Sequence, residues 1–402
     1  MVALHDPSRQ LNYLRQALSE DKRPLGLLLG AGCPVSVPSP DGNGPLIPAI
    51  SGVTERVCSE LGTNESHGEH FRQVVDQLAR DGNGTPNIED ILSHIRALRL
   101  AAGSDEVRGG LREGDLRALD DEVCKAVVEL MAVSLPGSGT PYHRLGAWIS
   151  AADRSCPVEV FTTNYDLLIE QALEQGRTPY FDGFVGSHRP FFDPHAVEDD
   201  KLPPRWARVW KLHGSIDWYS DTAGLSRGAP APGASYVIHP SHLKYDQSRR
   251  MPYLALADRL RGFLKQPGAV LVACGCSFGD EHVNDALGQG LAANPAAAAF
   301  GLLHGDLEAY PKAAILARAR PNLTLLARDS GVVGTTAGRW QYRQDAAVGD
   351  LSPFVESVRP EGAGAEQPAE VRFSLGDFAV LGEFLARLMG RGVWGEEAGD
   401  VI

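Results

Sequence analysis

Residues 158–175 have the sequence VEVFTTNYDLLIEQALEQ. The apolar run VEVFT is typical of a short buried strand, and the spacing of apolar residues in LLIEQALEQ is typical of a helix. The polar segment TTNYD lies between them, at the carboxyl end of the strand. This order of strand, polar turn and helix predicts one unit of an open α/β sheet, where ligands bind at the carboxyl ends of strands.

Further short apolar runs, each bounded by Gly or Pro, predict a mostly parallel sheet covered by helices. We expect its strands near 25–29, 158–162, 207–212, 235–238, 269–274, 299–303 and 323–327. The predicted fold class is therefore α/β, with a Rossmann-like, mostly parallel sheet flanked by helices.

About 130 residues lie between the first two of these strands, which is far more than one crossover helix needs. Helical periodicity predicts helices there at roughly 69–80, 88–101, 105–133 and 141–151. We expect a single domain, 1–402, with a nucleotide-binding core (25–54 and 155–330), a helical insertion (55–154) and a C-terminal extension (331–402).

The C-terminal extension combines a segment typical of a mobile linker, at 360–370, with an amphipathic helix. The apolar residues that share one face of this helix are Phe378, Leu381, Phe384, Leu385 and Leu388. Such a face more often packs in a core than docks a partner.

Composition excludes several classes of protein. The chain has 402 residues, 43% of them apolar, and a formal net charge of −13, which supports a sizeable core and disfavours autonomous binding to nucleic acid. No segment approaches the roughly 20 apolar residues of a membrane span. Scattered cysteines and the lack of a signal-like N-terminal stretch lead us to expect a cytoplasmic protein.

The segment GAG, from Gly30 to Gly32, directly follows the run LGLLL. Glycines at a strand end let the backbone approach a ligand, and exposed N–H groups there can cradle a pyrophosphate. A tight turn without a ligand explains the same residues, and the full GxGxxG pattern is absent.

The TTNYD segment holds four polar residues in five positions, including Thr163, Asn164 and Asp166. A helix cap needs only one polar side chain, so the surplus favours a binding site over a simple cap.

Two further strand ends carry polar residues. His213 and Gly214 follow one strand, in KLHGSIDW, and GCSFGD from Gly275 to Asp280 follows another. A lone histidine is more often structural than catalytic, and for Asp280 we favour the role of helix N-cap. Four such strand ends on one edge of a sheet nevertheless indicate a site.

In this order, GAG, TTNYD, HG and GCSFGDEHVN resemble the motifs of the sirtuin superfamily, which surround NAD. The chain is also similar to bacterial sirtuin-like NADases of antiphage defence, and to the stand-alone member encoded beside a HerA-like hexameric ATPase. That similarity is carried by LLLGAGCP with PLIPAISG, NIEDILSHI, HPSHLKYDQSRRMPY and LGDFAVLGEFL.

The resemblance implies a role for each motif residue. His213 is the general base near the ribose hydroxyls, and Asn164 contacts the nicotinamide ribose or the attacking water. The residues implied to bind other parts of NAD are Gly30, Ala31 and Gly32 (phosphates), Asp166 (carboxamide), Gly275 and Ser277 (adenosine side), together with Thr163.

Two features depart from the sirtuin pattern. The serine that follows GAGx in many sirtuins is Pro34 here, and Ser36, the nearest hydroxyl, is the candidate for its contact to NAD. The paired cysteines of the sirtuin zinc ribbon are missing, because residues 215–270 contain no cysteine, whereas a structural zinc needs about four Cys or His ligands. We therefore expect no zinc and disfavour protein deacylation.

The expected activity is that of an NAD+ hydrolase, with NAD+ as substrate and nicotinamide and ADP-ribose as products. The resemblance implies antiphage defence through NAD+ depletion (abortive infection), a homo-oligomer and a HerA-like ATPase partner. The alternatives are a binding module that senses NAD or ADP-ribose, and a sirtuin-type deacylase or ADP-ribosyltransferase. Cleavage of nucleic acid by an assembly with the ATPase ranks last.

Overall fold

The computed structural model of the chain describes residues 3–81, 85–102, 110–151, 154–199, 201–230, 234–238, 252–342, 353–358 and 370–390. Its centre is a ten-stranded sheet with the strand order β1-β15-β14-β13-β12-β11-β2-β3-β7-β4. The strands are β1 (Ala3–His5), β2 (Leu25–Leu29), β3 (Val158–Thr162), β4 (Tyr180–Phe181), β7 (Ala207–Lys211), β11 (Val270–Cys274), β12 (Ala298–Leu302), β13 (Leu323–Leu326), β14 (Ser330–Val333) and β15 (Thr336–Trp340).

The sheet is parallel except where β14 pairs with β13 and β15. The prediction of an α/β fold with a mostly parallel sheet is thus confirmed. Among the described residues the sheet starts earlier than predicted, because β1 precedes β2 and pairs with β15 at one edge.

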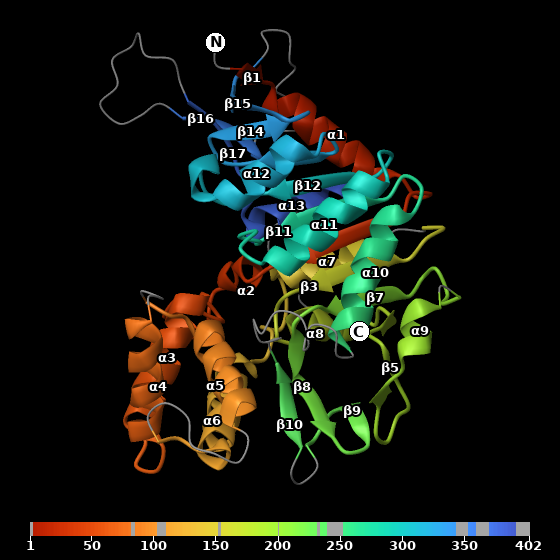
Figure 1. Cartoon of the computed structure of the whole chain (residues 1–402). Helices are drawn as coiled ribbons and strands as arrows, with labels where there is room; N and C mark the ends of the chain where they lie inside the picture. The colour runs from red at the N-terminus through yellow and green to blue at the C-terminus, as the bar shows by residue number, and fades with distance from the viewer. Residues whose placement is uncertain are drawn as a thin grey trace.

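Helices cover both faces of the sheet (Figure 1). Side chains alternate along each strand, so Leu25, Leu27 and Leu29 of β2 face one apolar cluster while Leu28 faces another. The first cluster includes residues of α1 (Pro7–Ser19), α7 (Pro141–Ala151), α8 (Leu168–Gln175) and α13 (Phe378–Leu388). The second includes residues of α9 (Pro194–Glu198), α10 (Tyr253–Lys265), α11 (Glu281–Ala293) and α12 (Pro311–Ala319).

A charged residue lies inside β3, one of the central strands of this sheet. Glu159 of β3 is 2% exposed and accepts hydrogen bonds from Arg259 at 2.6 and 2.9 Å and from Trp210 Nε1 at 2.8 Å. Because both carboxylate oxygens are satisfied, the charge is tolerated in a strand that otherwise looks fully apolar.

Four helices form a lobe of their own: α3 (Ile50–Gly62), α4 (Gly68–Arg80), α5 (Ile88–Ala102) and α6 (Glu113–Met131). They share a third apolar cluster, which also contains Tyr165, Ile216 and Ile238. The helices predicted at 69–80, 88–101 and 141–151 are present. The predicted helix at 105–133 is described only from 110, and its helical part begins at Glu113. Helix α7 packs against the main sheet instead of this lobe.

A second, antiparallel sheet lies beside the lobe (Figure 1). Its order is β10-β8-β9-β6-β5, with β5 (Phe184–Val185), β6 (Phe191–Phe192), β8 (Gly214–Asp221), β9 (Gly224–Arg227) and β10 (Ser235–Ile238). The strand predicted at 235–238 therefore exists but belongs to this small sheet and not to the main one. The aromatic rings of Phe184, Phe192 and Trp218 pack together in it, with centroids 5.0–6.5 Å apart.

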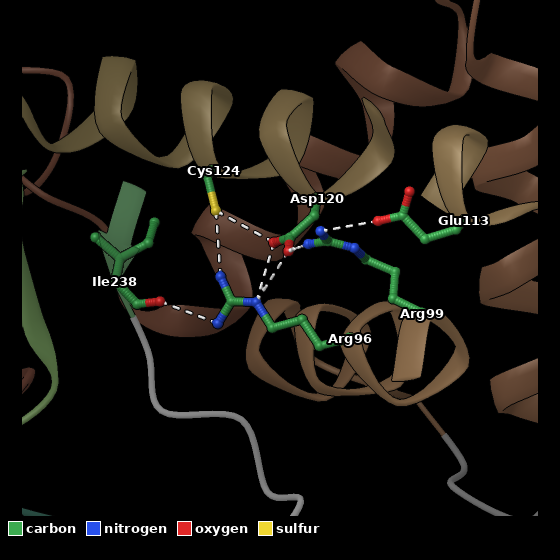
Figure 2. A network of polar contacts seen from close by, with 6 residues as sticks. All are labelled: Arg96, Arg99, Glu113, Asp120, Cys124 and Ile238. Carbon is green, nitrogen blue, oxygen red and sulfur yellow. Dashed lines mark hydrogen bonds and ion pairs between the residues drawn. The ribbon is translucent and has the colours of Figure 1, made fainter. Parts of the chain in front are cut away.

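A polar network ties the lobe to the small sheet (Figure 2). Arg96 of α5 donates to Asp120 of α6 at 3.0 Å and to the carbonyl of Ile238 at the end of β10 at 3.1 Å. Arg99 donates to the same carboxylate at 2.6 Å. Since Asp120 is largely buried, two guanidinium groups keep it satisfied as an ion.

Part of the expected C-terminal extension belongs to the main sheet, because residues 330–340 supply β14 and β15. Two further strands, β16 (Val355–Val358) and β17 (Glu370–Phe373), form an antiparallel pair. The linker expected at 360–370 lies outside the described residues except for Glu370. Among the helices of the described part, none is long and apolar enough to cross a bilayer.

Candidate functional site

The strand ends that precede the four motifs are aligned in the sheet. Strands β11, β2, β3 and β7 are parallel neighbours, and their last residues are register partners: Cys274 with Leu29, Leu29 with Thr162, and Thr162 with Lys211. The GCSFGD, GAG, TTNYD and HG segments therefore leave the sheet side by side at one edge.

This edge is also where the chain changes direction across the sheet. From β2 the chain continues to β3 and β7 on one side, and it later returns to β11 and β12 on the other side. In open α/β sheets, ligands bind in the crevice at such a switch point.

The GAG and GC turns pack directly on each other. A Cβ atom on Gly30 would lie 2.8 Å from Cys276 Cα, and one on Gly32 would lie 2.9 Å from Gly275 Cα. The Gly32 N–H donates to the Gly275 carbonyl at 2.9 Å. The glycines are thus needed for the contact between the two turns, which the sequence did not indicate.

Other parts of the two turns are accessible. Ala31 and Ser277 are exposed, whereas Gly275 and Ser36 are half-buried. The Ser36 hydroxyl donates to the Cys33 carbonyl at 2.8 Å, and Ser277 Oγ accepts from the N–H of Gly279 at 3.1 Å. Both predicted hydroxyl contacts therefore already have a partner within their own loop.

Asn164 is buried at the centre of the aligned ends. Its side-chain Nδ2 donates to the carbonyl of Gly30 at 3.1 Å, and its backbone N–H donates to Thr162 Oγ1 at 3.1 Å. The N–H of the neighbouring Thr163 donates to the Leu29 carbonyl at 3.2 Å. These bonds join the TTNYD segment to the GAG turn and fix the direction of the Asn164 amide.

Asp166 lies two residues before the start of α8. Its Oδ1 accepts from the N–H of Leu168 at 3.0 Å, which forms a turn just before α8, whose N-cap is Leu167. Burial raises the pKa of Asp166. Below it, Lys211 donates to the Asp166 carbonyl and, at 3.1 Å, to Glu170. Burial raises the pKa of Glu170 to about 7, although the charge of Lys211 acts against this rise.

His213 is buried and lies close to a carboxylate. Its Nε2 is 2.8 Å from Oδ2 of Asp280, while Oδ1 of Asp280 accepts from the N–H of Val283 at 2.9 Å. Burial by itself lowers the pKa of His213, but the hydrogen bond and charge of Asp280 outweigh it and raise the pKa above 6.5. Asp280 is thus the expected N-cap of α11 and also the partner of His213.

The backbone conformation at the position after His213 requires a glycine. Gly214 has a φ of +91°, and a Cβ atom there would lie 2.9 Å from the carbonyl carbon of Val237 in β10. His213 and Gly214 therefore lie where the chain leaves β7 of the main sheet and enters β8 of the small sheet.

The helical lobe reaches the site through Glu89 at the start of α5. Its carboxylate accepts from the hydroxyl of Tyr165 at 2.8 Å, and the Tyr165 ring lies 6.5 Å from the imidazole of His213. The segment NIEDILSHI carries part of the family resemblance, but its sequence does not indicate a role for Glu89. Nothing in the sequence of that segment indicates that Glu89 contacts Tyr165, which follows β3.

Two further buried oxygens near this edge, Tyr142 Oη and Glu170 Oε2, have no hydrogen-bond partner among the described residues. Burial, and then the nearby carboxylate of Asp166, raise the pKa of Tyr142. An unpaired buried hydroxyl is costly unless a ligand or a water satisfies it. In the described part of the chain, no cluster of His, Cys, Asp and Glu is arranged to hold a metal ion.

Comparison with solved structures gives weak likenesses to Sir2 proteins. One solved structure, which concerns the mechanism and regulation of Sir2 enzymes, is 13% identical to this chain. The match covers 79% of this chain and 92% of that one, with a TM-score of 0.36. A Sir2 homologue in complex with NAD is 14% identical over 75% of this chain and 86% of its own, with a TM-score of 0.32. A mutant Sir2 homologue in complex with ADP-ribose is 13% identical over 73% and 85%, with a TM-score of 0.33.

A comparison with curated protein sequences found no significant match. A family model described as the SIR2-like domain matches residues 158–322. The matched range contains β3, β7 and β11, and it excludes the GAG turn and the helical lobe. Residues 158–322, which include the TTNYD, HG and GCSFGD segments, are therefore similar to the SIR2-like domain.

Proposed function

We propose that this protein is an NAD+ hydrolase, which cleaves the bond between nicotinamide and ribose and releases nicotinamide and ADP-ribose. The observation that carries the proposal is the alignment of four polar strand ends, three of them inside the SIR2-like match. An NAD-related function follows from that domain, and hydrolysis is the step we add.

The proposed roles follow the positions of the side chains. Asn164 orients the reacting ribose or water, because its amide is fixed by the bond to the Gly30 carbonyl. His213 accepts a proton from water or from a ribose hydroxyl, since an imidazole titrates near neutrality. Nicotinamide needs no general acid to leave, because its ring nitrogen is already cationic in NAD+.

Cleavage of this bond passes through an oxocarbenium-like ribose, as in glycoside hydrolysis. A carboxylate-rich surrounding supports such a positive charge. Asp166 and Asp280 are buried or partly buried near the aligned ends. Asp166 is the residue that we propose for the carboxamide side of the site.

The remaining contacts to NAD+ are proposed from the two glycine turns. The exposed Ala31 and its neighbours Gly30 and Gly32 lie where the pyrophosphate is expected, and Gly275 and Ser277 lie on the side proposed for adenosine. The Gly32 N–H already donates to Gly275, so we propose that the phosphates use other donors of this turn. Thr163 and Ser36 are proposed as flanking contacts.

The test incubates the wild-type protein, Asn164→Ala and His213→Ala with NAD+ and follows nicotinamide and ADP-ribose by chromatography. We expect release by wild type only, with all three proteins equally folded by circular dichroism. Bound but intact NAD+ would instead support a sensing module. Consumption of NAD+ only with an acylated or protein acceptor would support a deacylase or ADP-ribosyltransferase.

The wider setting is also a proposal, supported by the quoted sequence resemblance. We propose that NAD+ loss acts in antiphage defence, in a homo-oligomer that associates with a HerA-like ATPase. We place no partner contact on the apolar face of α13, because this face is already buried in the chain. Its buried residues are Phe378, Leu381, Phe384 and Leu385, and the centroid of the Phe378 ring lies 4.9 Å from that of Tyr142. We propose that the partners contact the helical lobe instead.

A further inference from the structure

The pair between His213 and Asp280 joins residues from two different strand ends. His213 follows β7 and Asp280 precedes α11, and the two side chains meet with 2.8 Å between Nε2 and Oδ2. The His213 side chain is 10% exposed and that of Asp280 is 27% exposed. A charge-assisted hydrogen bond in such a partly buried place is stronger than one at the surface.

Asp280 differs from other aspartates that cap helices in the described residues. Asp6, Asp193 and Asp377 each accept hydrogen bonds from backbone N–H groups at the start of their own helix. Asp280 does the same with Oδ1 and the N–H of Val283, but its second oxygen contacts His213. The cap therefore holds the carboxylate in a fixed direction toward the imidazole.

Other charged and titratable groups in the described part of the chain also act on this pair. Glu89 of α5 adds a negative charge that acts on His213, and His282 acts on Asp280. Tyr165 lies between Glu89 and His213, with its ring 6.5 Å from the imidazole and its hydroxyl bonded to the carboxylate. The surroundings of the imidazole are thus mainly anionic.

We propose that Asp280 is a positioning residue, which holds the imidazole of His213 in orientation and tautomer for proton transfer. This inference rests on the proposed function. Asp280 stays ionised and accepts from Nε2–H, so the lone pair of neutral His213 is on Nδ1. When His213 takes a proton from water or a ribose hydroxyl, the imidazolium forms beside a carboxylate that stabilises it.

The key variant is Asp280→Asn, because asparagine still caps a helix well while the charge is removed. The matched control is Asp377→Asn, which makes the same change at the N-cap of α13, whose Oδ1 accepts from Ala379. Asp280→Glu restores the charge with a longer side chain. All three are compared with wild type for nicotinamide release across pH 5–9.

We expect turnover of Asp280→Asn to fall about 100-fold, within the usual contribution of a general base. The acid limb of its pH profile should move to lower pH, because the carboxylate that raises the pKa of His213 is gone. Asp280→Glu should recover part of the activity, and Asp377→Asn should stay within about twofold of wild type. A role in folding alone would lower activity without moving the limb.

A second measurement needs no turnover. Titration of ¹³C-labelled histidines by NMR, with the His213 signal assigned from His213→Gln, reports the pKa of this imidazole directly. We expect it to fall in Asp280→Asn and to stay unchanged in Asp377→Asn. An unchanged His213 pKa in Asp280→Asn, or turnover within twofold of wild type, overturns the proposal. If wild type releases no nicotinamide, the proposed hydrolase fails, and the NMR titration still decides whether Asp280 holds His213.

Discussion

Replacing Gly30 by alanine places a methyl group where two backbone turns touch. The added Cβ would lie 2.8 Å from both Cys276 Cα and the carbonyl carbon of Gly275, so one of the two turns must shift. Overpacking of this kind costs about 1–3 kcal/mol. The shift also weakens the bond from Asn164 Nδ2 to the Gly30 carbonyl, worth about 1 kcal/mol. We therefore expect Gly30→Ala to lower the free energy of unfolding by about 2–4 kcal/mol.

Urea denaturation followed by tryptophan fluorescence measures this change, and nicotinamide release measures its effect on the site. The control is Gly114→Ala in α6, where a Cβ atom meets nothing within 4 Å and alanine is expected to be neutral or to stabilise by up to about 1 kcal/mol. A Gly30→Ala protein whose stability lies within about 0.5 kcal/mol of wild type would refute the argument, because that is the size of an ordinary surface change.

Three further predictions concern charged side chains that are buried or half-buried. Lys211→Met leaves Glu170 without its cation, so Glu170 should be protonated at neutral pH and the chain should lose about 1–3 kcal/mol in urea through the lost hydrogen bonds; the loss should grow as pH rises, and Glu170→Gln should remove that pH dependence. The stability lost in Asp280→Asn should be about 1.5–3 kcal/mol between pH 3.8 and 6.5, because both charges are then present in the folded protein. It should shrink as pH rises through the raised pKa of His213, and also as pH falls below 3.8; a pH-independent difference from thermal melts would contradict the ion pair. Glu89→Gln should lower the free energy of unfolding by about 1 kcal/mol, because one hydrogen bond is weakened. It should also lower the pKa of His213 in an NMR titration. An unchanged pKa would show that Glu89 of the lobe does not act on His213.

The main sheet could be predicted because its signal is local. Leu25 to Leu29 and Val270 to Cys274 are short apolar runs between Gly or Pro residues, and both became central parallel strands. The edge strand β1 and its neighbour β15 carry no such run, and β1 exists because it pairs with β15 across the length of the chain. The strand at Ser235–Ile238 was predicted, but its sequence does not indicate which of the two sheets it joins.

In the candidate site, too, only the residues with a local sequence signal could be predicted. Asn164 and His213 could be selected because each follows an apolar run with a polar surplus. The second role of Asp280 could not, because a helix cap already explained that residue and the contact with His213 depends on how β7 and β11 are placed in the sheet. Glu159 was hidden for a related reason, since its partner Arg259 lies on a distant helix.

The most direct test of the central claim is the release of nicotinamide from NAD+ by the purified chain, measured alone and with a HerA-like ATPase. We predict that wild type converts NAD+ to nicotinamide and ADP-ribose under at least one of these conditions and that Asn164→Ala and His213→Ala do not. Intact NAD+ with wild type under both conditions, or equal release by the two variants, would contradict the account.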